Sequence, residues 1–362
     1  MFVLDSHCDT PSHILRLRDL SLDNEFAQVD FPKLKKGKVD GAFFALYIPA
    51  ALDVDAAREY LGRMLDGVKR TLSENQDKAT LTVSRSQALQ NKAEGRLSVF
   101  LGLENGSPLG DGDQAIDMLR RLYDEGVRYI TLCHSRDNQI CDSCASQSHK
   151  WGGLSPFGKR LVSEMNSIGM LVDVSHLSDS SFYDVLACSD KPVVATHSCC
   201  RALAGHPRNM TDEMIRALAQ RGGVIQINFY PVFLDSRFAE ILAESGIQER
   251  GERVEAEFIA EPSDDAKRRA WNDVQKELMA LDRPSYKLIA DHIDHVVELV
   301  GIDHVGLGSD FDGIAVTPEG MEDVSMLPKL FEELRARGYA EDDLIKIAGG
   351  NFLRVLDEVS VS

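Results

Sequence analysis

The sequence lacks the marks of several large protein classes. It has no phosphate loop of the form GxGxxG or GxxxxGK[ST], which argues against an open, doubly wound nucleotide-binding sheet. Its longest apolar stretch, residues 41–52, is far short of the roughly 20 residues that span a bilayer. Positive charge is scarce, because 40 Lys and Arg face 58 Asp and Glu and leave a formal net charge of −18. We therefore expect neither nucleic acid nor an anionic membrane as a partner.

Cysteine is also sparse. The seven cysteines form an odd, scattered set, unlike the dense framework of a secreted disulfide-linked protein, so we expect reduced thiols. Near the start of the chain, Asp5, His7 and Asp9 stand where an export signal needs an uninterrupted apolar segment, and we predict a cytoplasmic protein. Cys141 and Cys144 form a single CxxC motif. This motif is compatible with a redox pair, with a metal site and with two free thiols in a loop.

What the chain does contain is a repeated alternation of short apolar runs with longer amphipathic segments, which is typical of parallel β/α units. Eight strands are predicted at residues 2–8, 42–48, 97–103, 129–133, 170–175, 192–196, 223–229 and 305–309. Helices are expected at 56–72, 116–125, 157–168, 212–221, 285–300 and 321–337, with Ser155 and Thr211 as N-caps of two of them.

This count predicts an α/β fold, a (β/α)8 barrel of the TIM type, in which residues 1–362 form one domain. The charged segment 234–284 reads as a helical insertion between the seventh and eighth strands. Such an insertion could serve as a lid or as a subunit contact, and the sequence leaves a homodimer open.

Acids and imidazoles follow six of the eight predicted strands: His7 and Asp9, Glu104, His134, His176, His197 and Asp310. In a barrel these strand ends meet at one mouth, where active sites are built. A single short motif is weak, and one strand-end histidine is more often bonded to the backbone. So many buried ionisable groups are costly unless they pair or bind metal, so together they predict a metal site. Two zinc-like ions there would lower the pKa of a shared water and polarise a carbonyl, which favours amide hydrolysis.

The segments DSHCDTP, FLGLENG, LVDVSHLSD, ATHSCCRAL, HPRNM and VGLGSDFDG resemble the membrane (renal) dipeptidase family of zinc peptidases, including its soluble bacterial members. The resemblance runs from the first residues to the closing GGNFLRVL. It implies two zinc ions per chain on a metal-dependent hydrolase barrel, although other divalent metals stay open. The implied ligands are His7 and Asp9 for the first ion, Glu104 as the bridge, and His176 and His197 for the second ion.

The resemblance also implies roles at the substrate. Asp310 would carry the proton, with Asp312 of the same DFDG segment as its competitor. His134 would contact the substrate and the tetrahedral intermediate, and Arg208 would bind the C-terminal carboxylate of a dipeptide. The expected substrates are free dipeptides, including L-Xaa-D-Xaa dipeptides.

Two other functions remain open at this stage. A related amidohydrolase could act on another amide or a cyclic amide, but such enzymes commonly bridge their metals with a carboxylated lysine, and no predicted strand end carries a lysine. A barrel that binds metal without turnover is the other alternative.

Overall fold

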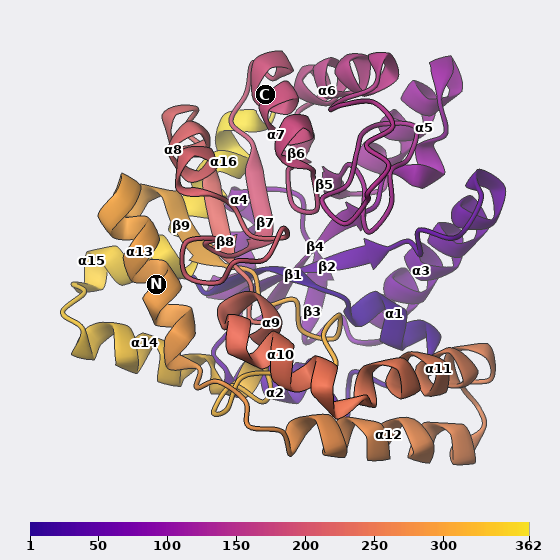
Figure 1. The fold of residues 1–362 in the computed structure, drawn as a ribbon, viewed down its shortest axis with the longest axis vertical. Coiled ribbons are helices and arrows are strands. Elements are labelled where there is room, and N and C mark those ends of the chain that lie inside the picture. The colour runs from indigo at the N-terminus through magenta and orange to yellow at the C-terminus, as the bar shows by residue number, and fades with distance from the viewer. Residues whose placement is uncertain (362) are drawn as a thin grey trace.

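Eight parallel strands follow one another around a central sheet in sequence order, as the computed structural model shows for residues 1–361 (Figure 1). They are β1 (Leu4–Cys8), β2 (Gly41–Tyr47), β4 (Leu97–Glu104), β5 (Val127–Thr131), β6 (Leu171–Asp173), β7 (Val194–Ser198), β8 (Val224–Ile227) and β9 (Val305–Leu307). A short additional strand, β3 (Ala79–Leu81), pairs with the outer part of β4 and was not predicted. The predicted (β/α)8 barrel is therefore confirmed.

The barrel closes where the chain beyond β9 meets β1. The backbone N–H of Asp310 donates to the carbonyl of His7 at 3.0 Å, and that of Asp9 donates to the carbonyl of Phe311 at 2.8 Å. Cys8 and Phe311 form an isolated parallel bridge at the same place. Because this seam lies at the C-terminal ends of both strands, closing the barrel brings the first and last predicted site residues together.

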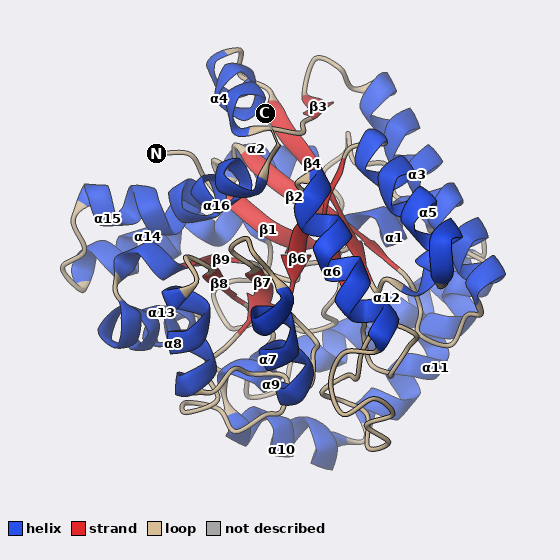
Figure 2. Ribbon diagram, turned by 90° about the horizontal axis from the view of Figure 1, so that it is seen from above, coloured by secondary structure: helices blue, strands red, loops and turns tan. Residues whose placement is uncertain are grey.

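Helices cover the outside of the barrel (Figure 2). Most follow a strand and bury an apolar stripe with helical spacing, as α5 does with Ala115, Ile116, Leu119 and Leu122. These helices are α1 (Thr10–Leu15), α2 (Phe31–Lys36), α3 (Val54–Glu74), α4 (Arg85–Ala93), α5 (Gly112–Asp124), α6 (Pro156–Ile168), α7 (Asp179–Cys188), α8 (Asp212–Gln220), α13 (Lys287–Val300), α14 (Leu327–Ala336), α15 (Glu341–Ile345) and α16 (Asn351–Val359).

Two predicted helix starts are confirmed by their capping bonds. The side chain of Ser155 accepts a hydrogen bond from the backbone of Gly158 at the start of α6, and Thr211 accepts one from Met214 at the start of α8. None of the helices in residues 1–361 combines the length and the apolar composition that crossing a membrane requires.

Four helices lie between β8 and the barrel helix α13. They are α9 (Pro231–Leu234), α10 (Ser236–Ser245), α11 (Ile247–Ala260) and α12 (Asp265–Met279), and the last three lie together along one edge of the molecule (Figure 1). Buried side chains of α10, α11 and α12, together with Val316 from the chain after β9, form a separate small core of Phe238, Leu242, Phe258, Trp271, Val274, Leu278 and Val316. This core stabilises the packing of α10, α11 and α12 and is separate from the core of the barrel.

The lower interior of the barrel is filled by aromatic rings. Phe43 stacks on Phe100 with 4.7 Å between ring centroids, and the ring of Tyr129 lies 5.2 Å from that of Phe43. Gly102 on β4 makes room for Tyr129, because a Cβ at residue 102 would lie 2.0 Å from the Cζ atom of that ring. The lowest layer of the interior is thus apolar, and buried polar side chains lie above it toward the C-terminal mouth.

Gly102→Ala is therefore expected to destabilise the protein by about 1 to 3 kcal/mol, because the added methyl group forces the buried Tyr129 ring to move. Gly62→Ala is a matched control, since residue 62 lies inside α3 and no atom lies within 4 Å of the added Cβ. That control should stabilise the helix by about 0.5 to 1 kcal/mol. Urea unfolding of both variants checks this, and equal free energies of unfolding would contradict it.

Candidate active site

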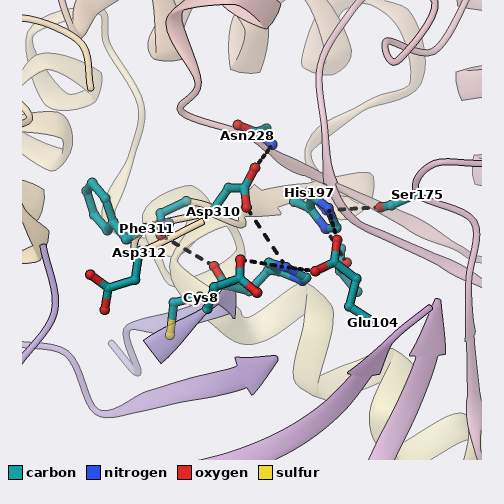
Figure 3. Close-up of polar contacts among 12 residues, drawn as sticks. Cys8, Glu104, Ser175, His197, Asn228, Asp310, Phe311 and Asp312 are labelled. Atoms are coloured by element: carbon teal, nitrogen blue, oxygen red, sulfur yellow. Dashed lines mark hydrogen bonds and ion pairs between the residues drawn. The ribbon is translucent and has the colours of Figure 1, made fainter. Parts of the chain in front are cut away.

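The seven side chains that follow the predicted strands converge at the C-terminal mouth of the barrel. His7 and His197 lie within β1 and β7, Asp9 follows β1, and Glu104 is the last residue of β4. The strands β5, β6 and β9 end earlier than predicted, so that His134, His176 and Asp310 each lie three residues beyond their strand. Figure 3 shows several of these side chains pointing toward one another from opposite sides of the barrel.

Glu104 lies at the centre of this cluster, and its two oxygens face different partners. Oε2 lies 3.5 Å from Nε2 of His7. Oε1 lies 3.0 Å from Nε2 of His176, 3.4 Å from Nε2 of His197 and 3.9 Å from Nε2 of His134. One buried carboxylate thus faces His7 with one oxygen and the other three histidines with its second oxygen.

The carboxylates on the His7 side complete a second set of ligand atoms. Nε2 of His7 lies 3.5 Å from Oδ2 of Asp9 and 4.0 Å from Oδ1 of Asp310. Three overlapping groups could each hold an ion, because their ligand atoms lie within 4.8 Å of one another. The groups are His7 with Glu104 and His197, Glu104 with His134 and His176, and His7 with Asp9 and Asp310.

The unsatisfied atoms of the cluster fit a divalent cation. Nε2 of His7 and Oδ1 of Asp9 are buried without a hydrogen-bond partner among the described residues. Such atoms are costly in a protein interior unless another group completes their coordination. Imidazole nitrogens and carboxylate oxygens are donors that zinc and other first-row divalent ions accept. The residues present therefore fit a metal centre.

Burial and neighbouring charges shift the pKa values of several side chains in the cluster. Burial and the nearby charge of Glu104 raise the pKa of Asp9 well above its usual range. Burial, and then the charge of Arg208, lowers the pKa of His176 well below its usual range, and burial with His7 does the same to the pKa of His197. Histidines held neutral in this way have the lone pair that a metal ligand needs.

Two hydrogen bonds orient site residues and were not predicted. The hydroxyl of Tyr129 lies 2.8 Å from Nδ1 of His7, and the amide of Asn228 donates to Oδ2 of Asp310 at 2.9 Å (Figure 3). Both partners lie on other strands or just past them, so nothing in the local sequence pairs them with their targets. The sequence signal that could have indicated these contacts is a polar side chain, a tyrosine or an asparagine, within a predicted apolar strand.

A further carboxylate, that of Asp5, is buried in β1 and was also missed. It accepts hydrogen bonds from the backbone N–H groups of His7, at 3.2 Å, and of Ser309, at 2.9 Å. Burial raises the pKa of Asp5 to about 6. This side chain thus joins β1 to the segment after β9, beneath the cluster.

The segment after β9 is bent sharply to aim Asp310 into the cluster. Asp310 and Asp312 have φ angles of 64° and 67°, in the left-handed region that non-glycine residues rarely adopt. A Cβ at Gly313 would lie 2.1 Å from Oδ2 of Asp9 and 2.7 Å from Oδ1 of Asp310, so a larger residue there would displace these carboxylates. Asp312 points away to a different partner, Arg18, which pairs with it at 2.7 Å. The structure thus brings Asp310, and not its predicted competitor, to the ligand group.

A cavity of about 510 Å³ opens above the cluster. Its floor includes Asp9, Glu104, His134, His176 and Asp310. Its roof comes from α10, α11 and α12 and includes Leu242, Gln248, Glu252, Glu255, Ile259, Trp271 and Leu278. The segment between β8 and α13 therefore covers the mouth of the barrel, and an ion pair of 2.8 Å between Arg16 and Glu255 ties it to the chain after α1.

Arg208 lies beside the cavity rather than among its lining residues. It is buried, and its guanidinium donates to Oγ of Ser198 at 3.0 Å and to the carbonyl of His197 at 2.9 Å. Its Nε is buried with no partner among residues 1–361. The guanidinium also lies 5.7 Å from the ring centre of Phe233, which does line the cavity.

The CxxC segment touches the site through its backbone and through Ser143, whose hydroxyl donates to the carbonyl of His134. The N–H of Cys144 donates to the carbonyl of His176 at 2.9 Å, while the thiol of Cys141 is buried. All seven cysteines carry free thiols, and the three ion-binding groups among the described residues contain histidine and carboxylate only. A metal-binding or redox role for this pair therefore has no support in the geometry.

Comparisons with known proteins identify the family of this chain. The model of the membrane dipeptidase family, peptidase family M19, matches residues 1–362. The dipeptidase aclJ of Aspergillus oryzae is 32% identical over 96% of this chain and 74% of its own length. The dipeptidase verJ of Clonostachys rogersoniana is 31% identical over 99% of this chain and 84% of its own length.

A solved structure has the same fold. The crystal structure of the probable dipeptidase PvdM from Pseudomonas aeruginosa superposes with a TM-score of 0.81 at 26% identity, covering 99% of this chain and 95% of the other. The family model, the curated relatives and the cluster of side chains that could hold a metal ion all lead to one conclusion. This chain belongs to the membrane dipeptidase family, peptidase family M19, and is a metal-dependent dipeptidase.

Proposed function

We propose that the chain is a binuclear zinc dipeptidase that hydrolyses the peptide bond of free dipeptides, including L-Xaa-D-Xaa dipeptides. The observation that carries the binuclear assignment is the position of Glu104, whose Oε2 faces His7 and whose Oε1 faces His176 and His197. A carboxylate with ligands on both sides is suited to bridge two cations. The stereochemical part of the proposal rests on the family resemblance.

The ligand atoms divide between two ions. His7, Asp9 and one oxygen of Glu104 would hold the first ion, and His176, His197 and the other oxygen of Glu104 would hold the second. When bound, such a pair of divalent ions makes water more acidic and polarises the carbonyl of an amide.

Asp310 is suited to carry the proton of the reaction. Oδ2 is held by Asn228, which leaves Oδ1 directed toward His7 at 4.0 Å. Burial raises the pKa of Asp310, so that its carboxyl takes up a proton more readily than an exposed aspartate. We assign it to accept a proton from the attacking water and to return that proton to the leaving amine.

His134 is suited to stabilise the oxyanion. It lines the cavity, and burial followed by the charge of Arg208 lowers its pKa, although Glu104 opposes the shift. A neutral imidazole carries one N–H, which we assign to the oxygen that becomes negative when water attacks the carbonyl.

Arg208 is suited to bind the substrate's free carboxylate, and the helices above the cavity are suited to act as a lid. The buried Nε of Arg208 has no partner within residues 1–361, and a planar guanidinium binds a carboxylate through two parallel hydrogen bonds. The roof from α10 to α12 limits the space available for longer peptides. The sequence leaves a homodimer open and predicts a cytoplasmic location, and both stay hypotheses.

Zinc titration and a substrate panel test the proposal. The metal-free protein should take up two zinc ions per chain and then hydrolyse L-Ala-L-Ala and L-Ala-D-Ala. A tripeptide and a cyclic amide such as hydantoin should be turned over poorly. Faster turnover of the cyclic amide would favour the related amidohydrolase, and tight zinc binding without any hydrolysis would favour a non-catalytic barrel.

Arg208→Ala should lower kcat/KM on dipeptides by an amount equal to about 2 to 5 kcal/mol, because it removes a buried charge that pairs with the substrate. A dipeptide with an amidated C-terminus should already be a poor substrate of the unchanged enzyme, and Arg208→Ala should scarcely lower its turnover further. Steady-state kinetics on the acid and amide pair measures this. Equal turnover of acid and amide by the unchanged enzyme would show that Arg208 has another role.

A further inference from the structure

One buried carboxylate outside the ligand set joins three strands just below the metal-binding histidines. Asp173, the last residue of β6, is fully buried and accepts four hydrogen bonds. Its Oδ1 accepts from the backbone N–H groups of Thr196, at 2.9 Å, and Ser175, at 3.0 Å. Its Oδ2 accepts from the hydroxyls of Thr131 and Thr196. No lysine or arginine is among its described partners.

The bonds around Asp173 fix the direction of the next hydrogen bond. In the 2.7 Å contact between the two side chains, the hydroxyl of Thr196 donates to Oδ2 of Asp173. That hydroxyl has only one hydrogen, and its oxygen lies 2.8 Å from Nδ1 of His197. Nδ1 of His197 must therefore carry the proton and donate to Thr196. The lone pair of the imidazole is then left on Nε2, which lies 3.4 Å from Oε1 of Glu104.

Asp173 also strengthens a thin part of the barrel. The ladder between β6 and β7 has a single register pair, Asp173 with Val194, whereas β2 and β4 share seven. His176 follows β6 and His197 lies in β7, and their Nε2 atoms are 2.9 Å apart. The backbone of His197 donates in turn to Oγ of Ser175 at 3.2 Å (Figure 3). Hydrogen bonds to the side chains of Asp173 and Ser175 thus join β6 to β7, where few backbone bonds do so. They help to set the distance between His176 and His197.

We propose that Asp173 is a positioning residue of the metal centre, which acts through the hydroxyl of Thr196 to hold His197 in the tautomer whose Nε2 can bind an ion. The proposal rests on the proposed metal site, since it concerns how one of its ligands is prepared. Nothing in the proposal requires Asp173 to touch metal or substrate. Its effect is to remove the cost of selecting a tautomer and a ring orientation when the ion binds.

The threonines around Asp173 offer a matched pair of variants. Thr196→Val removes the hydroxyl that links Asp173 to His197 and keeps the shape of the side chain. Thr131→Val removes the other hydroxyl that donates to the same Oδ2 atom, and among the described residues this hydroxyl bonds Asp173 and no histidine. Each change costs the same carboxylate oxygen one buried hydrogen bond, so a merely structural role of Asp173 predicts similar effects. Thr196→Ser retains the hydroxyl and should restore the link.

Zinc affinity, measured by competition with a chromophoric chelator, separates these roles. Thr196→Val should weaken one of the two ions by about 10- to 100-fold, the range for groups that support a metal ligand. Thr131→Val and Thr196→Ser should each stay within about 3-fold of the unchanged protein, because the imidazole keeps its partner. Equal weakening by Thr196→Val and Thr131→Val, or unchanged affinity in Thr196→Val, would overturn the proposal. If the unchanged protein bound no zinc tightly, the proposed function itself would fail.

Nitrogen-15 NMR of histidine-labelled, metal-free protein tests the tautomer without any activity measurement. The signal of His197, identified by its loss in His197→Gln, should show a protonated Nδ1 and an unprotonated Nε2. Thr196→Val should shift this signal toward the other tautomer, whereas Thr131→Val should leave it in place. A His197 protonated at Nε2 in the unchanged protein would contradict the proposal even if the threonine variants failed to fold.

Discussion

Asp310→Asn is expected to leave both ions bound and to lower the rate of dipeptide hydrolysis by about 100- to 10,000-fold. The amide keeps the shape of Asp310 but takes up no proton, and removal of a group that serves two proton transfers belongs at the upper end of that range. The hydrogen bond from Asn228 would have to rearrange, because an asparagine oxygen occupies only one of the two carboxylate positions. Metal analysis and steady-state kinetics on the same preparation measure both parts of the prediction.

Asp312→Asn is the matched control for this experiment. Asp312 lies two residues further along, but its carboxylate pairs with Arg18 at 2.7 Å and accepts a hydrogen bond from Thr10 at 2.9 Å. Losing a buried partner of an arginine should lower the free energy of unfolding, while kcat changes much less than in Asp310→Asn. If Asp310→Asn kept a near-normal kcat with full metal content, the proton would have to travel through another group, and His134 would be the next to test.

The strands of the barrel could be predicted because each is a short apolar run, and all eight appear close to their expected positions. The residues at which the strands end could not be predicted. The pattern extended the fifth predicted strand, residues 170–175, through Ser175, but the matching strand β6 ends at Asp173, because the side chain of Asp173 takes the backbone N–H of Ser175 away from the ladder. The extra strand β3 (Ala79–Leu81) escaped notice because three residues are too few to show any periodicity.

The candidate site could also be predicted only in part. The ligand set could be predicted because His7, Glu104 and the others follow strands, and strand ends of a barrel meet at one mouth. The groups that orient them could not, because the partner of Tyr129 is 122 residues away and depends on which ring fills the space left by Gly102. Nor does the sequence of the helical segment 231–279 say that it lies over the cavity, since that depends on tertiary packing alone.

Glu104→Gln is expected to disturb both metal positions at once. One oxygen of the carboxylate faces His7 and the other faces His176 and His197, so its charge would serve either ion. Glutamine keeps the length of the side chain but is neutral and offers one acceptor oxygen in place of two. Since groups that merely support a ligand change metal affinity by about 10- to 100-fold, loss of this ligand should weaken zinc binding by more than about 100-fold. Hydrolysis should fall with metal occupancy.

Elemental analysis after dialysis against free zinc measures the effect, with Glu125→Gln as the control. Glu125 is an exposed glutamate that pairs with Lys69 on the surface, so its replacement should leave two ions per chain. A mononuclear site held by the histidines alone would lose no more than one ion in Glu104→Gln and would show a single binding step in the unchanged protein. Two ions retained at full affinity in Glu104→Gln would show that Glu104 bridges neither of them, and the assignment of the ligands would have to be redrawn around Asp9 and Asp310.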